Sequence, residues 1–322
     1  MNEPTQNANN TALRVAVLAG GESAEAEVSR RSAAEVHKAL TALGHDSSLI
    51  ELDRQCAATL IKLKPDVVFP ALHGPPGEDG TVQGLLEMLG LPYVGSGVRG
   101  SALAMDKAVA KSVFRSHNLP VSAERIISNT ANLETTLSDI EQTFGRQVAI
   151  KPLNTGSALG VQLLPTGGDL HAALSAALQF GDCLVEPFIA GREITVGVLH
   201  TPTEIQAHPV IEIRTAANQW YDYKNRYTPG QSEHIVPADL TPEITNELQR
   251  IAITAHSALG LRDLSRADFL LDATDNITLL EVNTLPGMTP TSLYPDGAAA
   301  LGLNFDELID LLVRTAFIRS TH

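Results

Sequence analysis

The segment over residues 265–283, with the letters SRADFLLDATDNITLLEVN, constrains the fold of this chain more than any other. It predicts two short apolar strands, 265–271 and 277–283, joined by a polar turn. Side chains alternate between the two faces of a strand, so an antiparallel hairpin gathers every second residue on one face. The flanking apolar runs indicate that this hairpin is buried.

One face of the predicted hairpin carries polar side chains. A register centred on the turn sets Asp268 opposite Glu281, and Arg266 opposite Asn283. Facing carboxylates repel unless a cation or a proton lies between them. Oxygen ligands without His or Cys suit Mg²⁺, so Asp268, Glu281 and Asn283 are predicted to bind it. Arg266 is predicted to stabilise negative charge that develops during the reaction. The alternative is a surface hairpin with solvated charges, which the flanking apolar runs disfavour.

Charge and cysteine content narrow the class of protein. The chain has 37 acidic and 23 basic residues, a net charge of −14, which disfavours nucleic acid and anionic membranes as partners. Cys56 and Cys183 have no zinc-binding spacing, as expected in a reducing cytoplasm. No apolar stretch reaches the ~18 residues of a membrane helix. We predict a cytoplasmic protein whose residues 1–12 form a disordered tail.

Residues 13–97 alternate between strand and helix patterns. This alternation predicts a doubly wound parallel sheet of the Rossmann-like kind, whose ligands bind at the carboxyl ends of the strands. The capping-box spacing of Ser32 and Glu35 supports a helix over 29–43. The expected strands are 14–20, 46–52 and 66–72, and the other expected helices are 55–63 and 81–89.

Two residues near strand ends of this region are candidate ligand contacts. The turn after the first strand lacks a dinucleotide fingerprint and instead presents Glu25, which suits an ammonium group better than a phosphate. The alternative role of Glu25 is to complement the charge of a helix N-terminus. His73 ends the third strand in a glycine-rich loop, where it can approach a ligand, and Glu78 is expected to brace that loop.

Residues 98–186 and 187–322 differ from residues 13–97 in their pattern of predicted strands and helices. We expect a helical stretch over 98–118, followed by strands alternating with helices over 132–144 and 168–180. The third region opens with strands over 192–200 and 204–214, and it continues with a polar, aromatic loop over 215–231 and a helix over 241–259. Three domains are therefore expected, with bounds 13–97, 98–186 and 187–322.

A candidate phosphate site lies in the second region. Lys151 ends a strand before the loop NTGSALG, whose N–H groups and Ser157 can donate to a phosphate, and Lys107 is a second candidate cation. The strand that ends in Glu186, Pro187, Phe188 and Ile189 can bind adenine through backbone hydrogen bonds and apolar contact. Glu193 is positioned to reach a ribose.

These pieces, in this order, resemble the D-alanine–D-alanine ligases of the ATP-grasp superfamily. The resemblance covers the chain from about Arg14 to its terminal helices, and its most specific strings are LAGGESAEAEVS, ALHGPPGEDGTVQGLLE, SALAMDK, LLEVNTLPGMT and WYDYKNRY. It implies a three-domain α/β ligase that binds ATP, two Mg²⁺ (or Mn²⁺) and D-alanine, acts in peptidoglycan precursor synthesis and forms a homodimer.

The resemblance also implies roles for individual residues. Glu25, with His73 close by, binds the ammonium group of the first D-alanine, while Ser292 and Leu293 receive the carboxylate of the second. Arg266 and the Gly287 N–H stabilise the tetrahedral oxyanion. The remaining residues bind nucleotide and metal: Lys107, Lys151, Ser157, Glu186, Pro187, Phe188, Ile189, Glu193, Tyr221 and Arg226 for ATP, and Asp268, Glu281 and Asn283 for the metals.

The 215–231 loop is the expected lid over the site, with Tyr227 linked to Glu25 and Ser157. The chain departs from common relatives at Arg226, Thr155 and Pro187, which bears on ATP affinity more than on the reaction. The alternatives are a D-alanyl-D-lactate or D-alanyl-D-serine ligase, or a nucleotide-binding regulator without catalysis. A nicotinamide-dependent dehydrogenase is disfavoured by the missing glycine fingerprint.

Overall fold

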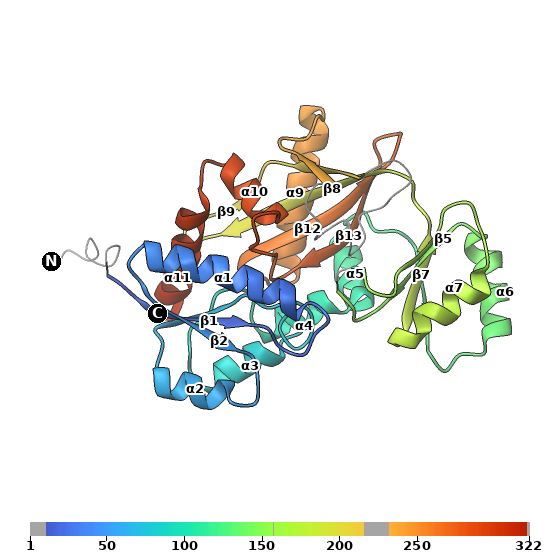
Figure 1. Cartoon of the computed structure of the whole chain (residues 1–322). Coiled ribbons are helices and arrows are strands. Elements are labelled where there is room, and N and C mark those ends of the chain that lie inside the picture. The colour runs from blue at the N-terminus through green and yellow to red at the C-terminus, as the bar shows by residue number, and fades with distance from the viewer. Residues whose placement is uncertain (1–10, 157, 216–231, 321–322) are drawn as a thin grey trace.

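The computed structural model describes residues 11–156, 158–215 and 232–320. Within them the chain forms three sheets, one parallel and two antiparallel (Figure 1). The predicted tail and the predicted lid both include residues outside the described ranges. Among the described helices, none is long and apolar enough to cross a membrane.

The parallel sheet has the strand order β2-β1-β3 and confirms the predicted alternation of strands and helices. Buried Val, Ile and Leu side chains lie on both of its faces, as expected of parallel strands covered by helices. Its elements are β1 (Arg14–Ala19), α1 (Ala26–Ala42), β2 (Asp46–Glu51), α2 (Cys56–Leu63), β3 (Val67–Pro70) and α3 (Thr81–Met88).

Helix α1 begins three residues before the predicted start, and the predicted capping box is wrong. The residue at the helix N-terminus is Glu25, which makes no capping hydrogen bond. The Ser32 hydroxyl lies inside the helix and instead accepts a hydrogen bond from the N–H of Met288 (3.2 Å). The Ser32 hydroxyl, which the local sequence pattern assigned to capping, therefore forms a long-range hydrogen bond instead.

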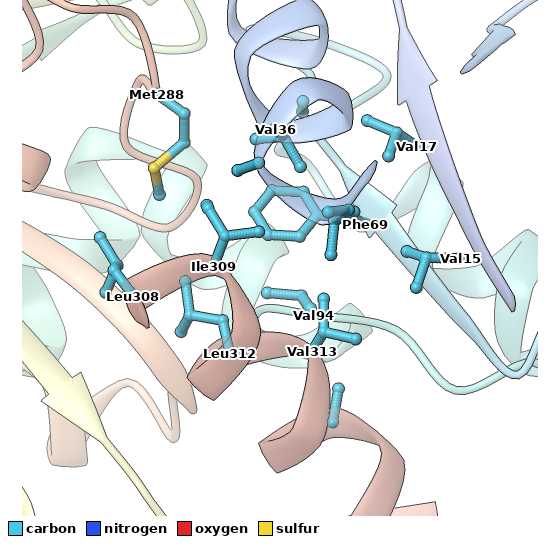
Figure 2. Packing of buried hydrophobic residues seen from close by; sticks show 14 of the residues in the cluster. Val15, Val17, Val36, Phe69, Val94, Met288, Leu308, Ile309, Leu312 and Val313 are labelled. Atoms are coloured by element: carbon cyan, nitrogen blue, oxygen red, sulfur yellow. The ribbon is translucent and has the colours of Figure 1, made fainter. Parts of the chain in front are cut away.

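The last helix, α11 (Phe305–Ser320), covers one face of the parallel sheet and lies beside α1. Figure 2 shows its Leu308, Ile309, Leu312 and Val313 packed against side chains of β1, α1 and β3. Met288 joins the same core and is 2% exposed. The core therefore fixes the backbone beside Gly287 to the parallel sheet.

The central sheet is antiparallel, with the strand order β4-β7-β5-β6. Helices α6 and α7 lie together on one side of β5 and β7 (Figure 1). The predicted helical stretch before it is interrupted at Asp106, whose carboxylate caps a second helix. The elements are α4 (Val98–Met105), α5 (Lys107–Ser116), β4 (Arg125–Ile127), α6 (Leu133–Phe144), β5 (Val148–Pro152), β6 (Gln162–Leu164), α7 (Leu170–Ala177), η2 (Leu178–Phe180) and β7 (Cys183–Pro187).

The large sheet has the order β11-β10-β8-β12-β13, with β9 also paired to β8. The single strand predicted over 204–214 is wrong, because Pro209, which has no N–H to donate, lies between two separate strands. The elements are β8 (Arg192–His200), β9 (Ile205–Ala207), β10 (Ile211–Thr215), β11 (Ser232–Ile235), α9 (Pro242–Ala258), β12 (Asp263–Leu271), β13 (Ile277–Asn283) and α10 (Leu293–Ala300).

His208, just before Pro209, is a buried neutral histidine. Its side chain is fully buried against Tyr294, and neither ring nitrogen has a hydrogen-bond partner within the described ranges. Burial lowers the pKa of His208 from 6.5 to about 4. The unfolded chain therefore binds this proton more readily, and the stability tied to neutral His208 is lost as the pH falls from 6.5 toward 4.

We expect a His208→Leu variant to lose less stability on acidification than the wild-type chain. Between pH 7 and pH 5 the difference in free energy of unfolding is expected to shift by about 2 kcal/mol in favour of the variant. Urea unfolding at the two pH values measures this shift. An identical pH dependence of the two proteins would contradict the assignment of a neutral buried ring.

Candidate active site

The β12–β13 hairpin has the predicted register. Arg266 pairs with Asn283 and Asp268 with Glu281, and a bulge follows Asp268. The Arg266 guanidinium forks onto Asp268, with Nε–Oδ1 and Nη2–Oδ2 distances of 2.8 Å. Thr195 on β8 donates to Asp268 Oδ1 at 2.6 Å. The predicted polar face is present, on a hairpin whose first strand is mostly buried and whose second strand is partly buried.

The donor set of this face fits a hard divalent cation. Asp268 and Glu281 are cross-strand neighbours, and the Lys107 ammonium lies 3.8 Å from Glu281 Oε2. The Asn283 amide nitrogen donates to Asp268 Oδ2 at 3.1 Å, so the amide oxygen has to turn for Asn283 to bind a metal. No group of three His, Cys, Asp or Glu side chains among the described residues forms a metal site, and the predicted set contains only two such residues.

The larger cavity, of about 390 Å³, lies between the central and large sheets. Most of the predicted ATP-binding residues line it. Its lining includes the apolar side chains of Leu184, Leu270 and Leu280 as well as charged side chains. The predicted residues in its wall are Lys107, Lys151, Glu186, Pro187, Phe188, Ile189, Glu193 and Glu281.

Glu186 is held by more cations than the sequence indicated. Its carboxylate pairs with Lys151 (Nζ–Oε2, 2.7 Å) and with Lys111, a residue absent from the predicted site. Burial by itself raises the pKa of Glu186, but Lys151 and Lys111 outweigh burial and lower the pKa to about 2. The Ser122 hydroxyl also donates to this carboxylate. Lys111 follows Lys107 by four positions on α5, which places the two lysines on the same face of the helix.

The second cavity, of about 330 Å³, lies between the parallel sheet and the loop that follows β5. Glu25 lines it and is 7% exposed. A Cβ atom placed on Gly156 would lie 2.9 Å from Glu25 Oε2, so the loop approaches the carboxylate closely. The structure thus brings the predicted ammonium-binding residue next to the predicted phosphate-binding loop.

His73 is buried, and Glu78 is partly buried, beside Arg266. The His73 Nε2 atom lies 3.3 Å from the Ser32 hydroxyl, and burial followed by the charge of Arg266 lowers its pKa to about 4. Burial and then the charge of Glu25 raise the pKa of Glu78 to about 8. Glu78 accepts the Gly74 N–H at 2.7 Å, as expected of a residue that braces the loop. The environment therefore favours the neutral form of both His73 and Glu78.

Gly287 lies close to two other predicted substrate contacts. A Cβ atom on Gly287 would be 2.8 Å from Ser292 Oγ and 3.8 Å from His73 Cε1. The Ser292 hydroxyl accepts the Thr289 N–H at 2.9 Å, directly before α10 begins. Leu293 is 4% exposed and packs with Ile211 and Ile213. The predicted residues Ser157, Tyr221, Arg226 and Tyr227 lie outside the described residues.

The cavities meet at Thr155. This residue lines the larger cavity, the Glu25 cavity and a small pocket of about 30 Å³ that Glu78, Glu281 and Asn283 also line. The Thr155 carbonyl accepts a hydrogen bond from Lys107 Nζ at 2.7 Å. The Lys107 cation, the hairpin residues Glu281 and Asn283, and Glu25, whose carboxylate suits an ammonium group, therefore line adjoining cavities that share Thr155.

Comparison with known proteins identifies the family. The family described as "D-ala D-ala ligase C-terminus" matches residues 113–314, and that described as "D-ala D-ala ligase N-terminus" matches residues 56–96. A D-alanine--D-alanine ligase of Halalkalibacterium halodurans is 44% identical over 304 residues, which cover 94% of this chain and 98% of the relative. A ligase of the same name from Gluconobacter oxydans is 42% identical, with 95% and 100% covered.

Solved structures agree with these relatives. The D-alanine--D-alanine ligase of Bacillus anthracis complexed with ATP has a TM-score of 0.82 at 28% identity, covering 96% of this chain and 99% of the other. The ligase of Coxiella burnetii also has a TM-score of 0.82, with 96% and 95% covered. The predicted α/β ATP-grasp fold with an N-terminal parallel sheet is confirmed. The chain belongs to the D-alanine–D-alanine ligase family.

Proposed function

We propose that this chain joins two D-alanines into D-alanyl-D-alanine at the expense of ATP, for peptidoglycan precursor synthesis. The observation that carries the proposal is the continuity of the site at Thr155, where the wall of the larger cavity meets the Glu25 cavity. A carboxylate is a poor acyl donor, so it must be activated beside the nucleotide phosphates before an amine attacks. A site of this shape supports that order of events.

In the proposed reaction, Glu25 binds the ammonium group of the first D-alanine. A carboxylate oxygen of that D-alanine attacks the γ-phosphorus of ATP as ADP leaves. The amine of the second D-alanine, after losing a proton, attacks the acyl phosphate carbon, and phosphate leaves. Arg266 and the Gly287 N–H stabilise the tetrahedral oxyanion. Ser292 and Leu293 receive the carboxylate of the second D-alanine, and His73 orients the first. Mg²⁺ (or Mn²⁺), when bound by Asp268, Glu281 and Asn283, neutralises phosphate charge.

The nucleotide part of the proposal rests on the larger cavity. Lys107 and Lys151, with Ser157, bind the phosphates. Residues 186–189 and Glu193 bind the nucleoside, with Tyr221 and Arg226 from the predicted lid over 215–231. Tyr227 closes the lid toward Glu25 and Ser157. The apolar leucines of the cavity support binding of a flat base.

The cellular setting and assembly are further parts of the proposal. We propose a cytoplasmic homodimer of three-domain chains with the bounds 13–97, 98–186 and 187–322. The three described sheets fall almost entirely one into each range, which supports these bounds. Light scattering of the purified chain, together with ultracentrifugation, tests the dimer, and a monomer at micromolar concentration would contradict it.

Release of phosphate from ATP is expected to require D-alanine and to yield the dipeptide as the main product. The test offers D-alanine alone, and then equimolar D-alanine and D-lactate or D-serine, at pH 7, with products identified by mass. A majority of D-alanyl-D-lactate or D-alanyl-D-serine would replace the proposed product by one of its alternatives. ATP binding without turnover would favour a regulator. A Tyr227→Phe variant that shifts toward lactate would support the proposed lid contact.

A further inference from the structure

Lys111 is a buried lysine behind the wall of the larger cavity. Its side chain is 2% exposed, and it lies on α5, one helical turn after Lys107. A lysine is almost never fully buried unless it is paired, and the cost of burial must be offset by fixed anions. The burial of the Lys111 ammonium therefore needs an explanation, and the proposed contacts between the catalytic residues and the substrates do not give one.

The partners of Lys111 form a chain of charges that ends at the cavity. Its ammonium pairs with Glu186, lies 3.1 Å from Glu124 Oε2, and donates to Ser122 Oγ at 3.0 Å. Glu124 has a second cation, Arg115, on its outer side. Glu186 has its second cation, Lys151, on the cavity side.

The two cations on Glu186 differ in what they can do. The Lys111 side chain is buried and does not line the cavity. Lys151 lines the cavity and is 17% exposed, so it can turn toward a bound anion. Turning away leaves the Glu186 carboxylate, which is 5% exposed, dependent on Lys111 for a counter-charge.

We propose that Lys111 is a positioning residue for nucleotide binding: it is the permanent counter-ion of Glu186 and so releases Lys151 to bind the polyphosphate. Without Lys111, the buried carboxylate retains Lys151, and phosphate has to compete with an ion pair in a poorly solvated site. This inference rests on the proposed binding of ATP in the larger cavity. It adds a residue that touches no substrate but leaves the Lys151 ammonium available to bind ATP.

The direct test replaces Lys111 by Met, which keeps the length of the side chain and removes its charge. We expect ATP to bind about 10- to 100-fold more weakly, the size of one charge-assisted hydrogen bond, with a matching rise in KM for ATP. The KM for D-alanine is expected to stay unchanged. Lys111→Arg, which keeps the cation, is expected to recover most of the ATP affinity.

Arg115→Met is the matched control. It removes a cation from the same helix and the same ion-pair chain, but from the Glu124 end, and it is expected to leave ATP affinity unchanged. Equal losses in Lys111→Met and Arg115→Met would mean that the chain of charges serves stability only. Failure of the wild-type protein to bind ATP would instead overturn the proposed function, so the two failures are distinguishable.

A double variant keeps the inference testable even where Lys111→Met does not fold. Once Glu186 is neutral, Lys111 has no anion to hold on the cavity side. Glu186→Gln and Glu186→Gln/Lys111→Met are therefore expected to bind ATP equally, as measured by calorimetry. Weaker binding by the double variant would overturn the proposal, as would unchanged ATP affinity in a folded Lys111→Met protein.

Discussion

Replacing Asp268 by Asn, or Glu281 by Gln, is expected to lower kcat by about a thousandfold or more, because a bound metal contributes several kcal/mol of charge stabilisation to phosphoryl transfer. The two carboxylates face each other across the β12–β13 hairpin. A neutral amide in either position removes a charge from the predicted metal site. Steady-state assays with varied Mg²⁺ or Mn²⁺ measure the effect, and Mn²⁺ binding can be followed separately by electron paramagnetic resonance.

Comparing the two variants separates the effect of losing the metal from the effect of losing the Arg266–Asp268 ion pair. Asp268 also binds the Arg266 guanidinium, so its loss changes two interactions, whereas Glu281 pairs with Lys107 at 3.8 Å. Asp275→Asn makes the same change of charge in the exposed turn of the same hairpin and is expected to leave kcat unchanged. Undiminished turnover in both the Asp268→Asn and the Glu281→Gln variant would contradict the assignment of these residues to a metal site.

The hairpin was predictable because residues close together in the sequence determine it. Alternation along each strand and a short turn fix the register, so Asp268 opposite Glu281 follows from the sequence alone. The parallel sheet was predictable for a similar reason, since its strands and helices alternate in order along the chain. The predicted cluster of nucleotide contacts also depended on the family resemblance, which supplied the long-range arrangement.

The remaining features depend on partners far away in the chain. Ser32 forms no capping box because its hydroxyl reaches Met288, 256 positions later. Lys111 was missed because Glu186 is 75 positions away, and a lysine on a helix ordinarily faces water. Local patterns state which groups can form hydrogen bonds or ion pairs, but they do not state which distant group will bind them.

Replacing Arg266 by Met is expected to lower kcat by about 100- to 1000-fold, the usual effect of losing one oxyanion-stabilising donor. Arg266 is 9% exposed and already held by Asp268, so its guanidinium is preorganised before substrate binds. Because the oxyanion forms when the amine attacks, the acyl phosphate is expected to persist and to be lost to water. The ratio of ATP consumed to dipeptide formed should therefore rise above one.

Two further measurements make this prediction specific to Arg266. The charge of Arg266 helps to hold the pKa of His73 down, after burial, so Arg266→Met is expected to raise that pKa from about 4 while burial keeps it below 6.5. Arg266→Lys keeps the charge but loses the fork, and it is expected to restore the pKa more fully than kcat. Arg262→Met is the control, because Arg262 lies over Tyr93, away from Asp268. Unchanged coupling of ATP use to dipeptide formation in Arg266→Met would contradict the oxyanion role, because an amide bond would then form without the guanidinium as readily as with it.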